Sequence, residues 1–112
     1  MTMANDMRLP FVDMMVCIAR AWVYCDGGMH EKSITAVEQG LMLCQGIGAL
    51  PFYRLTLRCA GLWAQVEQRA NGSLPMKQST TLGARILLFK KDSREHGIDQ
   101  FVIIADLLSS RL

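Results

Sequence analysis

The side chains of this sequence that are best suited to chemistry are cationic, and they are concentrated in one segment. Between Pro51 and Arg94, eight basic residues stand against only two acidic ones, which is a local excess of +6 in a chain with a formal net charge of +2. The first fifty residues carry three basic and five acidic side chains. A cationic segment is typical of a surface that meets a polyanion, nucleic acid above all, although scattered Arg and Lys also form ordinary solvated faces.

Five of these cations are candidates for contact with DNA phosphates. Two lie four residues apart on a predicted helix and would share one face, and three form a cluster further along. Such side chains position a duplex without reading its bases, and no base-reading motif accompanies them. The five candidates are Arg54, Arg58, Lys90, Lys91 and Arg94.

The residues that commonly carry catalysis or bind metals do not converge. No phosphate-binding glycine loop or nucleophile–base motif occurs, and the two histidines, His30 and His96, fall in predicted turns where a solvated position is the default. The cysteines, separated by 8, 19 and 15 residues, include no C-x-x-C pair. We therefore expect no enzymatic activity, cofactor, metal site or small-molecule substrate, and we expect all four cysteines to be thiols of the core.

The elements that would position these residues are helical. Helices are predicted over 11–26, 30–44, 51–70 and from Ile98 to about Leu108, because apolar residues recur at three- and four-residue steps. The segment 73–79 is predicted to be a loop. Residues 80–91 fit a short helix, or a strand through Arg85–Phe89, with helix favoured because Leu outnumbers β-branched residues in that stretch. The fold class expected for residues 1–112 is therefore all-α, a single domain of about five helices.

The first predicted helix is apolar on nearly every face, so it should lie at the centre of the domain or in a subunit interface. The high hydrophobic content of so small a chain also favours an additional buried interface, either in a homodimer, which we expect, or with a stable partner. The apolar run is too short to cross a membrane and no signal peptide precedes it, so we expect a cytoplasmic protein. The candidate interface residues are Phe11, Met14, Met15, Ile18 and Trp22.

The end of the sequence carries a distinctive short pattern. Asp92-Ser93-Arg94 precedes the last predicted helix, which closes on the run from Leu107 to Leu112. This pattern resembles the end of FlhD, the D subunit of the bacterial flagellar master activator, whose relatives on conjugative elements activate transfer genes. Ala19 to Asp26 and Leu50-Pro51 are similar to the family's long first helix and to the start of a later one.

The resemblance implies an all-α subunit that dimerises and joins a zinc-binding C-type partner. The complex would bind promoter DNA and contact RNA polymerase, with the zinc held by the partner. Two other classes stay open. One is a small helical chaperone, adaptor or inhibitor that binds another protein through the Met-rich first half; the other is a module resembling the TerB domains of tellurite resistance, through the pattern around Asp26-Gly27 and Glu31.

Overall fold

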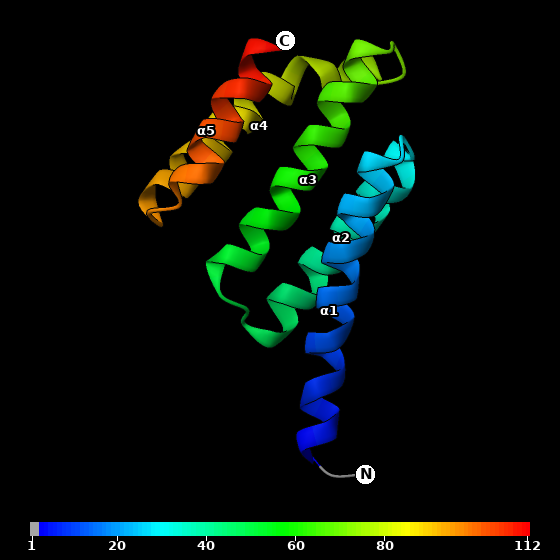
Figure 1. The fold of residues 1–112 in the computed structure, drawn as a ribbon, viewed down its shortest axis with the longest axis vertical. Coiled ribbons are helices and arrows are strands. Elements are labelled where there is room, and N and C mark those ends of the chain that lie inside the picture. The colour runs from blue at the N-terminus through cyan, green and yellow to red at the C-terminus, as the bar shows by residue number, and fades with distance from the viewer. Residues whose placement is uncertain (1–2) are drawn as a thin grey trace.

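Five α-helices joined by short connections make up nearly all of the computed structural model, which describes the backbone of residues 3–112 and the side chains from Pro10 onward (Figure 1). No strand occurs in this part of the chain, so the all-α prediction is confirmed. No helix of the described part combines the length and the apolar character that crossing a membrane requires. The helices are α1 (Met3–Asp26), α2 (His30–Ile47), α3 (Pro51–Ala70), α4 (Met76–Glu95) and α5 (Asp99–Ser110).

The connection between α2 and α3 shows how the sequence sets helix boundaries. Gly48 follows α2 with a positive φ of 63°, and its N–H donates to the carbonyl of Cys44. Glycine adopts this left-handed conformation without the steric cost of a Cβ atom. Pro51 then occupies the first position of α3, where its missing N–H costs no hydrogen bond.

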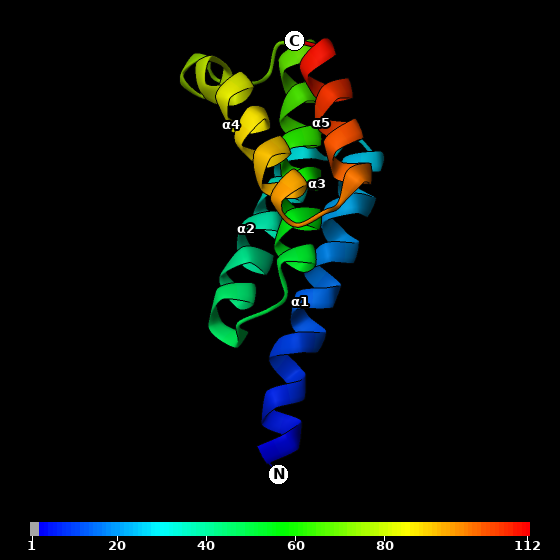
Figure 2. The ribbon, with the colours of Figure 1, turned by 90° about the vertical axis from the view of Figure 1, so that its left-hand side faces the viewer.

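Two helices begin well before the positions that the sequence predicts. α1 begins at Met3 rather than at residue 11 and runs through Pro10, and its first turns project beyond the end of α2 (Figures 1 and 2). α4 begins at Met76, inside the predicted loop, and continues to Glu95. The segment 80–91 is helical because Leu82, Ile86 and Phe89 lie on one face and bury it.

α3 is the centre of the molecule. It lies between the α1–α2 pair and the α4–α5 pair and packs against all four helices (Figure 1). Among residues 3–112, no Cα atom of α1 or α2 lies within 8 Å of one in α4 or α5. Of the two positions predicted for the first helix, α1 does not occupy the centre of the domain, because it packs on α2 and α3 with one face only.

Two hydrophobic clusters share α3. Toward α4 and α5, α3 presents Leu55, Cys59, Leu62 and Val66 at three- and four-residue steps, and they pack around Phe89. Toward α1 and α2 it presents Leu57 and Ala60, which pack with residues such as Met14 and Val37. Each pair of helices therefore completes its core against a different face of α3.

Aromatic rings form a row across these helices. Phe11 of α1 meets Tyr53 of α3 edge to face with ring centroids 5.8 Å apart, and Tyr53 meets Phe52 at the same distance. Phe52 stacks on Phe101 of α5 at 5.8 Å, and Phe101 lies 5.7 Å from Phe89 of α4. These separations are in the range of favourable aromatic pairs, so the row links α1 to α4 through α3 and α5.

Packing between the first three helices depends on a glycine in α2. A Cβ atom at Gly40 would lie 2.9 Å from both Cδ atoms of the buried Leu57 and 3.1 Å from Cβ of Cys17. Gly40→Ala should therefore destabilise the fold by about 1–3 kcal/mol despite the better helix propensity of alanine. Gly46 is the matched control, since it lies in the same helix with open space around it, and Gly46→Ala should stabilise by up to about 1 kcal/mol. Equal midpoints of chemical denaturation for the two variants would contradict this packing.

Candidate functional site

Two of the five candidate phosphate-binding residues are occupied by ion pairs. Arg58 Nη1 donates to Asp92 Oδ2 at 2.7 Å, and its guanidinium lies over the Phe89 ring at 5.6 Å. Lys90 Nζ lies 2.6 Å from Asp106 Oδ1 of α5. These two cations hold α4 against α3 and α5, so they are less available to an external anion than the sequence predicts.

The other three candidates, Arg54, Lys91 and Arg94, are exposed and have no carboxylate partner among the described residues. Arg54 and Arg58 lie with His96 and Asp92 around a hollow of about 420 Å³ between the start of α3 and the end of α4. Lys91 and Arg94 are both exposed on α4, one helical turn apart. The fold therefore brings the basic residues of two distant segments to one end of the α3–α4 pair.

The predicted interface residues divide into two groups. Met14 has no exposed surface, and its Sδ accepts a hydrogen bond from the Cys44 thiol at 3.1 Å, so the structure places Met14 in the core instead. Trp22 is half-buried, donating to Thr56 Oγ1 and meeting Trp63 edge to face, and Ile18 also packs on the core. Phe11 and Met15 remain exposed.

A continuous apolar stripe of α1 is exposed, and we call it the outer α1 face. Its residues follow the i, i+3, i+4, i+7, i+11 spacing of one helix face, and no other described helix covers them. Of these residues the sequence singled out Met15 alone, because α1 is apolar on both sides and its pattern does not reveal which side meets α2. The outer α1 face consists of Val12, Met15, Val16, Ala19 and Val23.

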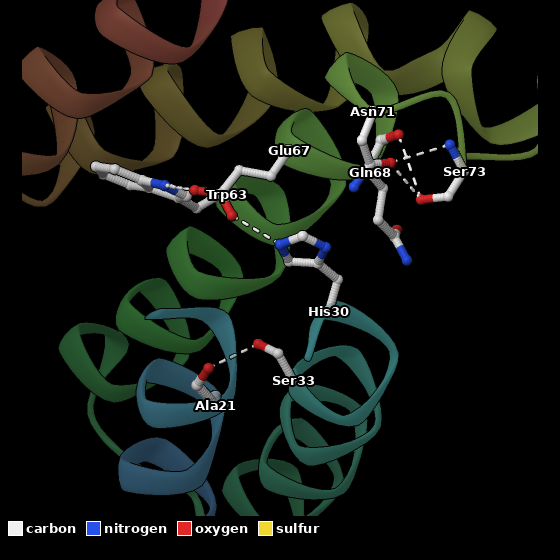
Figure 3. A network of polar contacts seen from close by, with 8 residues as sticks. All are labelled: Ala21, His30, Ser33, Trp63, Glu67, Gln68, Asn71 and Ser73. Carbon is white, nitrogen blue, oxygen red and sulfur yellow. Dashed lines mark hydrogen bonds and ion pairs between the residues drawn. The ribbon is translucent and has the colours of Figure 1, made fainter. Parts of the chain in front are cut away.

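A partly buried polar network, which was not predicted from the sequence, joins the start of α2 to the last turns of α3 (Figure 3). His30 Nε2 lies 2.7 Å from Glu67 Oε2, and Trp63 Nε1 donates to the other oxygen of the same carboxylate at 3.0 Å. The His30 side chain is only 12% exposed, so the prediction of a solvated surface position is wrong for this histidine, while His96 is exposed. His30 and Glu67 are 37 positions apart, and no spacing pattern in the sequence indicates that they pair.

The network has the parts of a proton-transfer pair but lacks a nucleophile. The nearby hydroxyl of Ser33 donates to the carbonyl of Ala21 at 2.6 Å and so ties α2 to α1 (Figure 3). In covalent catalysis a histidine–carboxylate pair activates a hydroxyl or thiol that lies within hydrogen-bond reach of the ring. Within residues 10–112 His30 has no hydrogen bond to a hydroxyl or thiol, and we interpret the pair as a structural clamp.

All four cysteines are buried and free, which confirms the prediction that they are core thiols. Burial raises the pKa of the Cys59 thiol to about 12, with a smaller contribution from Cys25. Burial, then the charges of Glu67 and Asp26, raise the pKa of Cys25 to about 11. No group of three or more potential ligands in the described part of the chain could hold a metal ion.

The thiols should therefore react slowly in the folded protein. At pH 8 only roughly one Cys59 in ten thousand is a thiolate, the form that attacks a disulfide reagent, whereas a thiol in the unfolded chain is roughly one-quarter ionised. Labelling with a thiol reagent, followed by mass spectrometry, should modify Cys17, which retains 6% of its surface exposed, before Cys59, which has none, with full reaction only after unfolding. Labelling of Cys59 in the native protein at the unfolded rate would contradict this.

No family model, no curated protein and no solved structure matches this chain.

Proposed function

We propose that this chain is an assembly subunit that forms a homodimer through the outer α1 face and acts by binding other macromolecules rather than by catalysis. The observation that carries the proposal is the exposure of this apolar stripe, which runs along more than two turns of α1. An exposed contiguous apolar patch on a small domain marks a protein-binding surface, because its burial removes apolar area from water.

The charges beside the stripe support a second copy in antiparallel orientation. Asp13 and Arg20 are exposed, lie seven residues apart and border the same flank of the stripe, next to Met42 of α2. In an antiparallel two-fold pair of helices, each flank meets the same flank of the partner helix. An axis between Val16 and Ala19 would therefore bring each Asp13 close to the Arg20 of the other copy, and the small Ala19 at the centre would let the helices approach closely.

The dimer is testable with a matched pair of variants. Val23 and Ile103 are 66% and 67% exposed, so a glutamate at either position costs the monomer little. Val23→Glu would place a carboxylate opposite the apolar Val12 of the second copy and should weaken dimerisation by at least about tenfold. Ile103→Glu on α5 should leave it unchanged. Sedimentation at micromolar concentration should show twice the 12.5 kDa chain mass for the wild type.

The orientation has its own test. Asp13→Arg and Arg20→Asp should each weaken the dimer, because each puts like charges across the interface, and the double variant should recover it. A wild-type monomer would overturn the homodimer and leave the alternative of an adaptor or inhibitor that uses this face for a different protein. A dimer that is insensitive to these charges would overturn the antiparallel arrangement alone.

We propose as a second function that the dimer is the D-type subunit of a cytoplasmic transcription activator. It would join a zinc-binding C-type subunit, bind promoter DNA with it and contact RNA polymerase through the complex. This candidate is supported by the position of three exposed cations, Arg54, Lys91 and Arg94, at one end of the α3–α4 pair. Two copies would present twice this number to the phosphates of a duplex.

Removal of the exposed cations should weaken DNA binding without changing sequence preference. Phosphate contacts release counterions, so Lys91→Ala/Arg94→Ala should lower the affinity for any duplex at low salt. The same change should make the salt dependence shallower by up to about two units for each copy that contacts the duplex. Arg69→Ala/Lys77→Ala is a control of equal charge, since both residues are exposed at the opposite ends of α3 and α4. Fluorescence anisotropy with a labelled duplex measures both effects, and equal losses in the two double variants would leave only a nonspecific effect of net charge.

A further inference from the structure

A groove of about 440 Å³ lies between α2 and α4, with α3 as its floor. Figure 2 shows α2 and α4 on the same side of α3, where every Cα atom of one helix stays more than 8 Å from those of the other. Gly61 belongs to this floor and allows α2 to pack closely on α3, since a Cβ atom there would lie 3.2 Å from Cγ1 of Val37. The volume is within the range of pockets that bind small organic molecules.

The walls of this groove are mainly apolar. Ile34 and Val37 line it from α2, Leu62 lines it from α3, and Leu88 lines it from α4. Leu88 remains 53% exposed although it faces the groove, so it has apolar surface that a ligand would cover. An occupant must therefore have an apolar body.

The charges in the groove do not balance. Arg58 and Asp92 both line it and neutralise each other in their 2.7 Å ion pair. Arg85 has only neutral partners, since Nη1 donates to Gln65 Oε1 at 2.5 Å and Nη2 donates to the carbonyl of Gln78 at 3.3 Å. Its Nε is buried and has no hydrogen-bond partner among the residues whose side chains the structure describes. The lining side chains therefore carry a net charge of +1, held by one half-buried guanidinium.

We propose that this groove binds a small organic monocarboxylate, with the carboxylate on Arg85 and the apolar body against Ile34, Val37 and Leu88. A guanidinium pairs with a planar carboxylate through two parallel hydrogen bonds, which its present neutral partners do not supply. A single negative charge matches the net charge of the lining, whereas a phosphate dianion would leave one charge uncompensated among apolar side chains. Partial burial also lowers the pKa of Arg85, as expected for a cation short of counter-charge.

The test is calorimetric titration of the purified chain with sodium octanoate, with 1-octanol and acetate as probes that lack the charge or the apolar body. Octanoate should bind one site per chain at least about tenfold more tightly than either probe, because the charge-assisted bonds and the apolar contacts act together. Arg85→Met keeps the apolar stem and should reduce octanoate affinity by about tenfold while leaving octanol unchanged. Equal affinities for octanoate and octanol, or an unchanged affinity in Arg85→Met, would overturn the proposal.

A second pair of variants tests the groove independently of Arg85. Leu88→Ala removes part of the apolar wall and should weaken octanoate binding several-fold. Leu87→Ala is the neighbouring control, because Leu87 is exposed and does not line the groove. Both substitutions affect exposed leucines, so far-ultraviolet circular dichroism should be unchanged in both. Equal effects of the two variants would show that octanoate binds elsewhere on the surface, and the absence of binding heat at millimolar octanoate would also refute the site.

Discussion

The structure depends on α3 serving two hydrophobic cores at once. The backbones of the α1–α2 pair and the α4–α5 pair approach α3 but not each other, so neither pair completes its core without this helix. α3 meets the requirement with large residues such as Leu55 and Leu62 toward one pair and small residues such as Ala60 and Gly61 near the other. The groove between α2 and α4 and the exposed side of α1 both follow from this arrangement. Because the other four helices all pack around α3, no described helix fills the space between the two pairs or covers the outer side of α1.

The basic side chains between Pro51 and Arg94 divide into exposed cations and cations that pair with carboxylates. Most of the local positive charge predicted from the sequence is still exposed, but Arg58 and Lys90 are drawn into pairs that join α4 to its neighbours. Half-exposed pairs of this kind contribute roughly 1 kcal/mol or less to stability. Their larger effect is to reduce repulsion within the basic segment and to leave Arg85 as the cation of the groove that has only neutral hydrogen-bond partners. The uncompensated positive charge of the basic segment is therefore concentrated at a few side chains and is not spread evenly over one face of the molecule.

The sequence predicted the helices well wherever burial follows one period, as in α3 and α5, and it predicted the buried thiols. It did not reveal which side of α1 is covered, because a helix that is apolar on both sides carries no such signal. Met14 is buried, whereas the neighbouring Met15 is exposed. The sequence also missed His30 and Arg85, whose partners lie 37 and 20 positions away. Such sites arise only from tertiary packing, so residue type and spacing carried no signal for them.

The row of aromatic rings has a consequence for recognition by α1. Its far end is anchored, since Phe89 has no exposed surface and Phe101 is nearly buried, while its near end at Phe11 is open to solvent. Each ring in between already rests on a neighbour, so its rotamer freedom is lost during folding of the chain and not during association. A partner that covers Phe11 therefore orders few additional side chains, and the conformational entropy cost that normally weakens binding is small on this side of the molecule.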